Sequence, residues 1–250
     1  MSVDINFEET ITVTVQQESF LANERNKTRL IQLLTQKMVV EGIETRVATG
    51  DSDTYIVRYG LEKETSHPTL AVIGADVDLN VLLIALAPTE SGIYFMKPGK
   101  GKVKAKIFST RKLQKELSFA QTILLLHAFS GCDATSKIYR KSKTSIVNLF
   151  KNQLSQMKNI ADIFYNPSST LDAISQAGEK MFLAIYKAPA NEQNLINHRY
   201  AAFLKSSIRV KYNLSSIPPT KGTLEQHSFR VYLQIQQWSG HEETMDPYSQ

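Results

Sequence analysis

The apolar run TLAVIG at residues 69–74 is the feature that most limits the fold of this chain. A continuous aliphatic stretch of this length is typical of a parallel strand that is buried on both faces. The segment ADVDLNVLLIALAP follows directly. Parallel strands need a crossover connection, which is usually a helix, so this order favours an α/β sheet.

The segments on either side continue this alternation. The expected strands are 45–48, 93–96 and 103–108, and the expected helices are 52–63, 109–117 and 119–129. Asp51 and Ser109 stand where helix N-caps are expected, and KPGKG is a hairpin loop between the last two strands. We therefore predict an α/β sheet over about residues 44–135.

The two ends of the chain have other patterns. Residues 9–15 predict a short strand, and a helix is expected from residue 18 to about 40, ended by Glu41 and Gly42. Later helices are expected at 155–164, 169–187, 191–206 and 223–238. The expected division is an N-terminal strand and helix (1–43), an α/β core (44–154), an all-helical region (155–240) and a tail (241–250).

Composition excludes several classes of protein. No apolar stretch reaches the roughly 18 residues that a membrane span needs, and the first residues lack the pattern of a signal peptide. The single cysteine rules out an internal disulfide and a cysteine-based zinc site. We therefore expect a soluble protein of the cytosol or nucleus that is not secreted and does not bind membranes.

The basic residues gather in two places. The net charge of +5 weakly favours an anionic partner. One group lies in the hairpin segment KPGKGKVKAK and the other follows the string GCD; their members are Lys100, Lys102 and Lys104, and Arg140, Lys141 and Lys143. The hairpin lacks Walker A spacing, so it is either a solvated basic loop or a surface that follows phosphate groups.

Two acidic pairs stand where α/β proteins usually place their sites. Asp51 and Asp53 begin the helix after the first expected strand, and Asp76 and Asp78 follow TLAVIG. Ligands of open α/β sheets bind beyond the carboxyl ends of the strands. Asp133 follows another apolar segment, so we expect it to meet these pairs at that edge.

Carboxylates that converge on one edge repel each other unless a cation lies among them. Oxygen ligands of this kind suit Mg²⁺ or Mn²⁺, and two such ions about 4 Å apart promote phosphodiester hydrolysis. The structural alternative stays open: Asp51 and Asp76 cap helices, while Asp53 and Asp78 are exposed first-turn residues that the helix dipole favours.

The strings DSDTYIVRYGLE, AVIGADVDLNVLLIAL and LLLHAFSGCDATSKIYRKSKTSIVNLF resemble the internal half of XPG/flap-endonuclease-type nucleases. That family carries an acidic pair at a helix start, a D-x-D after the next strand and a G-x-D before a helix-turn-helix. The resemblance implies a PIN-like parallel sheet flanked by helices over 44–154. It also implies these metal ligands, the last three of them catalytic: Asp51, Asp53, Asp76, Asp78 and Asp133.

A closer resemblance spans nearly the whole chain and is to animal proteins that carry HAFTGCDTTS. The shared strings appear here as FLANERNK, IYFMKPGKGK and IPPT followed by QHSFRVYLQIQQW. The nuclease family has further acids ahead of the position of Asp51, and here none stands in that context. We therefore expect the C-terminal part of a longer protein, or a degenerate copy. The turn YRKSKTS also lacks the glycines of the family.

The sequence thus predicts a metal-dependent nuclease-like domain that hydrolyses branched, flapped or single-stranded DNA. The metal-bound water is the expected nucleophile, and the basic residues named above are the expected contacts to the DNA backbone. The alternative is a catalytically inactive remnant that binds nucleic acid or protein. Cys132 is expected to be a small buried residue, His127 to pack or cap at its helix end, and Trp238 to pack against the helical region.

Overall fold

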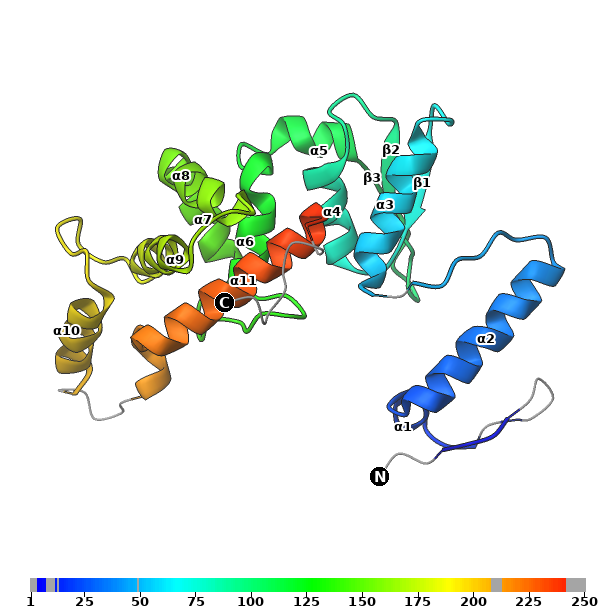
Figure 1. Ribbon diagram of the computed structural model, residues 1–250, viewed down its shortest axis with the longest axis horizontal. Coiled ribbons are helices and arrows are strands. Elements are labelled where there is room, and N and C mark those ends of the chain that lie inside the picture. The colour runs from blue at the N-terminus through cyan, green and yellow to red at the C-terminus, as the bar shows by residue number, and fades with distance from the viewer. Residues whose placement is uncertain (1–3, 8–11, 13, 49, 208–212, 242–250) are drawn as a thin grey trace. The chain divides into compact units, whose positions relative to one another are not determined.

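The computed structural model describes residues 4–7, 12, 14–48, 50–207 and 213–241. The chain divides into two units, Met1–Asp51 and Ser52–Gln250 (Figure 1). The second unit combines a small sheet with many helices, so the expected mixture of helix and strand is confirmed. No helix in the described part of the chain is both long and apolar enough to cross a membrane.

The first unit contains α1 (Gln17–Leu21) and α2 (Glu24–Val40) in place of the single helix expected there. The helix is interrupted because the Asn23 side chain accepts hydrogen bonds from the first N–H groups of α2 and caps it. The Asn26 side chain is buried and accepts a hydrogen bond from the Ile5 N–H. These asparagines give the string FLANERNK a structural role. The strand expected at 9–15 falls mostly outside the described residues.

The sheet of the second unit has the strand order β1 (Leu70–Ile73), β2 (Ile93–Lys97) and β3 (Lys106–Ser109). β1 is parallel to β2, and β3 is antiparallel to β2. The expected hairpin is therefore confirmed, but the sheet is mixed rather than wholly parallel. The prediction of a strand at 45–48 was wrong, because these residues are irregular and pair with no described strand.

Three helices precede, connect or follow the strands of the sheet along the sequence. α3 (Ser52–Glu64) packs on β1, with Gly60 facing the side chains of Leu70 and Val72. α4 (Val77–Leu86) is the crossover between the two parallel strands. α5 (Thr110–Glu116) follows β3 and is capped by Ser109, as expected. The β–α–β order predicted from TLAVIG is thus present.

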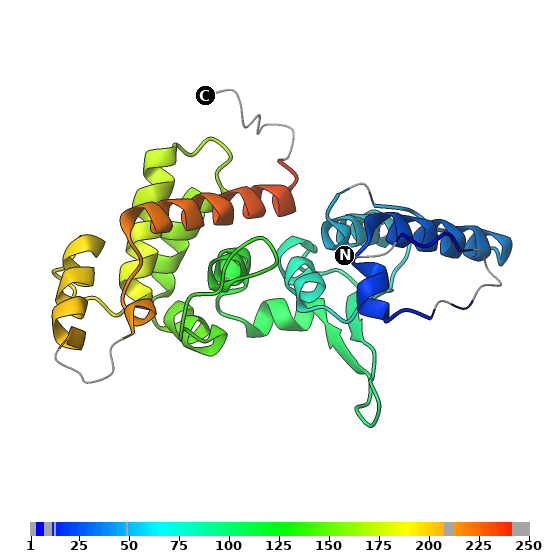
Figure 2. The same ribbon diagram turned by 90° about the horizontal axis from the view of Figure 1, so that it is seen from below.

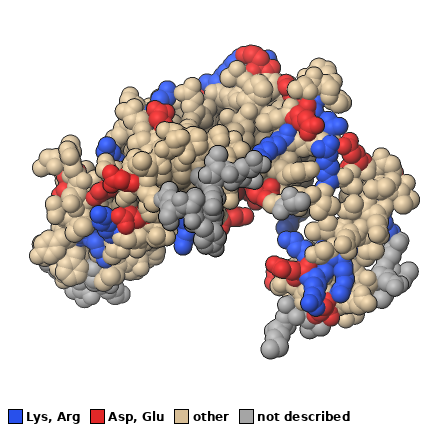
Figure 3. Space-filling view, in the orientation of Figure 1, with Lys and Arg blue, Asp and Glu red and all other residues tan. Residues whose placement is uncertain are grey.

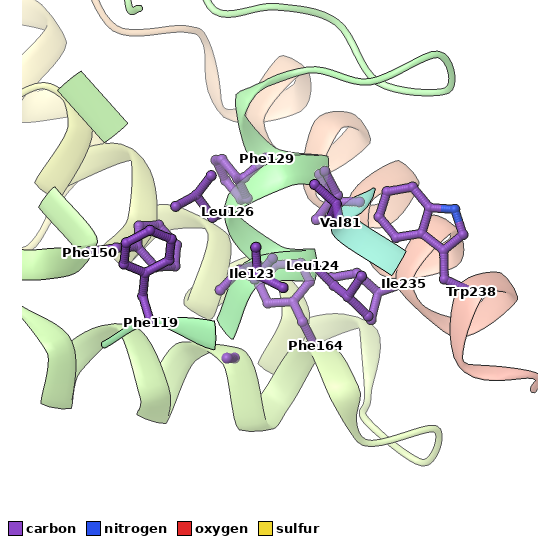
Figure 4. Close-up of a cluster of buried hydrophobic side chains, with 14 of the residues drawn as sticks. Val81, Phe119, Ile123, Leu124, Leu126, Phe129, Phe150, Phe164, Ile235 and Trp238 are labelled. Atoms are coloured by element: carbon purple, nitrogen blue, oxygen red, sulfur yellow. The ribbon is translucent and has the colours of Figure 1, made fainter. Parts of the chain in front are cut away.

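The centre of the second unit is α6 (Ile123–Ser130), all of whose residues are buried. A 3₁₀ turn, Ala120–Thr122, precedes it, so the expected helix begins with a tighter turn. Figure 4 shows α6 between Phe119 and Phe150 on one side and Ile235 and Trp238 on the other. The sheet half and the helical region therefore share one hydrophobic core.

The helical region follows in order. Its elements are α7 (Lys143–Asn152), α8 (Leu154–Tyr165), α9 (Leu171–Ile185), α10 (Leu195–Ser207), the 3₁₀ turn Leu214–Ser216, and α11 (Lys221–Ser239). α11 packs against α6, α8 and α9 (Figure 1). It ends at Gly240, whose left-handed conformation (φ 90°) suits the residue after a helix.

Polar side chains of α11 complete the ends of neighbouring helices. His227 Nε2 donates to the Phe129 carbonyl of α6 at 3.2 Å, and Gln236 Nε2 donates to the Phe164 carbonyl of α8 at 2.7 Å. Carbonyls in the last turn of a helix have no partner within the helix. The string QHSFRVYLQIQQW therefore supplies hydrogen bonds that buried helix ends need.

We expect acid to destabilise the fold partly through His227. Burial lowers the pKa of His227, so the unfolded chain takes up a proton near pH 6.5 while the folded chain resists it. Stability is then fully present above about pH 6.5 and declines below it, by at most about 1.4 kcal/mol per pH unit from this group. Urea unfolding of the wild type and of His227→Gln at several pH values measures this decline. An equally steep decline in the variant would contradict the assignment.

Candidate functional site

Two carboxylates stand side by side where β1 passes into α4. Asp76 is the N-cap of α4, and its Oδ1 accepts a hydrogen bond from the Asp78 N–H at 3.2 Å. Asp76 is exposed, whereas the Asp78 side chain is only 17% exposed. The capping alternative is thus confirmed for Asp76, but the partial burial of Asp78 means that it is not simply an exposed first-turn residue.

Asp78 is held by a buried histidine from α6. His127 Nε2 lies 2.8 Å from Asp78 Oδ1, and the His127 side chain is 4% exposed. Its other ring nitrogen, Nδ1, lies 3.4 Å from Lys143 Nζ at the start of α7. The ring of Trp238 on α11 packs beside it, with ring centroids 5.8 Å apart. Asp78, His127 and Lys143 thus form a series of polar contacts across three helices.

The surroundings of the His127 ring favour its neutral form near pH 7. Burial and the Lys143 ammonium lower the pKa of His127, and the Asp78 and Asp76 carboxylates oppose that shift without cancelling it. A neutral imidazole has one donor and one acceptor. The neighbours determine the tautomer: Nε2–H donates to the Asp78 carboxylate, and Nδ1 accepts from Lys143. The contact is therefore a hydrogen bond to a carboxylate, with no charge on the ring.

Within the second unit, the structure does not gather the predicted carboxylates Asp53, Asp76, Asp78 and Asp133 into one cluster of described residues. Asp53 is in the first turn of α3, and Asp51 is the last residue of the first unit. Asp133 is exposed in the irregular segment after α6 and has no hydrogen-bond or ion-pair partner among the described residues. In the described part of the chain, no three histidine, cysteine or acidic side chains are grouped closely enough to hold a metal ion.

By donor chemistry alone, the pair Asp76 and Asp78 would suit a single Mg²⁺ ion rather than two. Magnesium usually keeps several waters and is bound by one or two carboxylates together with substrate phosphates. Each carboxylate uses Oδ1 for the bonds described above, and its Oδ2 accepts no hydrogen bond from the described residues. A second ion would require a further carboxylate beside this pair.

The lysines of the β2–β3 loop form an exposed group. Lys100, Lys102 and Lys104 are all exposed, and the loop is held by a bridge between Lys100 and Val103. Figure 2 shows this loop extending away from the helices of the second unit. A solvated loop is what the simpler alternative predicted, and the same exposure makes the lysines accessible to phosphate groups.

The second basic group is divided by the structure. Lys143 contacts His127, whereas Lys141 Nζ donates to the Ile185 carbonyl at 3.1 Å and lies over the Tyr186 ring. Arg140 is exposed and stands in a left-handed conformation (φ 55°). Residues 131–142 contain no helix, so the expected helix-turn-helix is α6, a long irregular segment and α7.

The most important residue that sequence reasoning missed is His127, which was expected only to pack or cap at the end of α6. The missed signal was a histidine within the run ILLLHAF, because a buried polar side chain needs a partner. Trp238 was expected to pack against the helical region; it is 4% exposed, and its ring packs beside His127 of α6. Cys132 is half-buried, with Sγ 3.2 Å from Thr135 Oγ1.

Charge alone does not mark a site. On the face of the second unit turned to the viewer in Figure 3, basic and acidic side chains are interspersed. Local contacts therefore carry more information than the net charge. Comparison with protein-family models, with curated proteins and with solved structures finds no match to this chain.

Proposed function

We propose that this chain is a nuclease-type domain of PIN-like lineage that acts on nucleic-acid phosphodiester bonds with the help of a divalent cation. The observation that carries the proposal is the carboxylate pair Asp76 and Asp78 at the carboxyl end of β1, with Asp78 oriented by a buried histidine. This edge is the usual ligand site of α/β sheets. A ligating carboxylate held by a second hydrogen-bonded residue is typical of built metal sites.

The residues divide the chemistry among themselves. Asp76 and Asp78 would hold Mg²⁺ or Mn²⁺, which supplies an activated water and charge stabilisation when bound. His127 donates Nε2–H to Asp78 Oδ1 and so would orient this carboxylate, leaving Oδ2 for the ion. Lys143 holds the imidazole in the tautomer that makes this donation possible. The exposed loop lysines would neutralise backbone phosphates.

A second candidate function is nucleic-acid binding without hydrolysis. The observation that favours it is that Asp76 and Asp78 have no third carboxylate grouped with them among the described residues. A domain of this kind would keep the basic surfaces and lose turnover. Cleavage and binding must therefore be measured separately on the same substrates.

The test is cleavage of flapped, branched and single-stranded DNA in the presence of Mg²⁺, Mn²⁺ or a chelator. The proposal expects cleavage that begins with either ion and stops when the chelator is added. Binding in all conditions without any cleavage would overturn the proposed hydrolysis and favour the second candidate. Neither binding nor cleavage of DNA or of matched RNA would overturn both.

Substitution of the loop lysines is expected to have a smaller effect, on DNA affinity, and this effect can be measured separately from cleavage. We expect the double variant Lys102→Gln and Lys104→Gln to bind DNA more weakly at low salt and to reduce the slope of log affinity against log salt by about one for each phosphate that is no longer neutralised. Lys158→Gln on the exposed face of α8 is the matched control. Fluorescence anisotropy at several salt concentrations, with chelator present, measures the slopes. Equal slopes in all proteins would contradict the role of the loop.

A further inference from the structure

A second basic feature lies where α7 packs beside α9. It is a hollow of about 630 Å³ between α7 and the end of α9. We call it the basic hollow; the lining residues that matter here are Arg140, Lys141, Lys187, Ser145, Asn148 and Asn152. All of its charged lining residues are basic, and none of the described residues that line it is acidic.

One cation of the basic hollow, Lys141, is held in place by the fold. Lys141 Nζ donates to the Ile185 carbonyl and packs over the Tyr186 ring at 4.2 Å from its centroid. Burial lowers the pKa of Lys141, and the nearby charge of Lys187 lowers it further. Two like charges are thus kept close together without a counter-charge in the lining. An ammonium has three donors, so Lys141 retains donors beyond the one that caps α9.

Two of the basic residues occupy unusual backbone conformations. Arg140 and Lys187 have φ values of 55° and 54°, and they are the non-glycine residues with positive φ in the described chain. Lys187 follows the end of α9, where its N–H donates to the Ala184 carbonyl and the Ala188 N–H donates to the Leu183 carbonyl. Glycine is the usual residue at this position. A lysine at this position has a strained backbone, and its side chain adds a positive charge to the hollow.

We propose that the basic hollow binds the terminal phosphate of a nucleic-acid strand. A terminal phosphate carries close to two negative charges near neutral pH, whereas a backbone phosphodiester carries one. A concave site with several cations and amide donors therefore favours the terminal group. That the phosphate belongs to a nucleic acid rests on the proposed function; the binding of a phosphate group to the hollow does not.

The Lys187 position allows a variant that should not damage the fold. Lys187→Gly removes the charge and relieves the positive-φ strain, so its thermal stability should equal or exceed that of the wild type. Lys158→Gln on α8 removes a comparable exposed charge away from the hollow and serves as the control. Any loss of phosphate recognition in Lys187→Gly is then not a loss of folding.

The experiment measures anisotropy of single-stranded oligonucleotides with a 5′-phosphate, a 3′-phosphate or neither, with chelator present to prevent cleavage. We expect wild type and Lys158→Gln to prefer a phosphorylated end by about tenfold, the size of one charge-assisted contact, and Lys187→Gly to lose that preference. Inorganic phosphate should compete more strongly against the phosphorylated oligonucleotide than against the unphosphorylated one.

The outcomes separate this inference from the proposed function. If the wild type has no preference for a phosphorylated end, or if Lys187→Gly keeps the preference, the hollow is not a phosphate site, and cleavage at Asp76 and Asp78 is untouched by that result. If a Lys187-dependent preference is present but no divalent ion supports cleavage, the phosphate site is supported and the proposed hydrolysis is contradicted.

Discussion

Asp78→Asn is expected to lower divalent-ion-dependent cleavage by more than about 100-fold, because even residues that only support a metal ligand change activity by about 10–100-fold. The substitution keeps the size of the side chain and its hydrogen bond to His127 Nε2–H but removes the negative charge that holds the cation. Asp172→Asn is the matched control, since Asp172 also stands at the second position of its helix, α9, and is exposed. It should cleave like the wild type.

The role of His127 is separated from that of Asp78 by measuring Mn²⁺ binding directly. His127→Phe keeps a buried ring beside Trp238 but removes the donor to Asp78, so we expect Mn²⁺ affinity to fall by about 10–100-fold. His127→Gln can still donate and should lose less. Paramagnetic resonance of free Mn²⁺ gives these affinities without a substrate. If Asp78→Asn binds Mn²⁺ with wild-type affinity, the ion does not bind at this site. If His127→Phe binds Mn²⁺ with wild-type affinity, His127 does not support the ion site.

Phe129→Ala is expected to destabilise the protein by about 3–5 kcal/mol, the range found when a buried phenylalanine is cut back to alanine. Phe129 is 0% exposed and its ring packs edge-on against Phe164, Phe182 and His227. It therefore joins α6 to α8, α9 and α11, and the cavity left by its removal has rigid walls on several sides.

The comparison for this prediction is Leu233→Ala, which shortens a 45% exposed side chain on α11. It should change stability by much less, because little apolar surface returns to water. Urea unfolding followed by circular dichroism measures both. A loss below about 1 kcal/mol in Phe129→Ala would contradict the placement of α6 at the centre of the core.

Local pattern was sufficient for most elements of the second unit. TLAVIG does contain a strand, but the expected burial on both faces was wrong, because Val72 is buried whereas Ala71 and Ile73 are exposed. Ser109 and Gly240 begin or end helices through hydrogen bonds made within a few residues. The sequence was less informative at 45–48, where β-branched residues have strand propensity. Strands need a partner, and no described strand lies beside these residues.

The site was only partly predictable for the same reason. The pair Asp76 and Asp78 follows from position alone, since both residues belong to the start of one helix after one strand. Whether Asp51, Asp53 and Asp133 join them depends on how separate elements pack, and spacing along the chain does not determine that. The irregular segment after α6 folds back, with Thr135 Oγ1 donating to the Ala128 carbonyl, and leaves Asp133 exposed.

The sequence by itself thus determined the β–α–β order, most helix positions and the carboxylate pair, because each depends on interactions between residues close together in the chain. Only the tertiary structure decided which residues support that pair and where charges converge. Asp78 and His127 are 49 residues apart, and Lys141 and Ile185 are 44 apart. Such contacts form because packing of α4, α6, α7 and α9 around one core brings distant side chains together, and no local preference records which of them will meet.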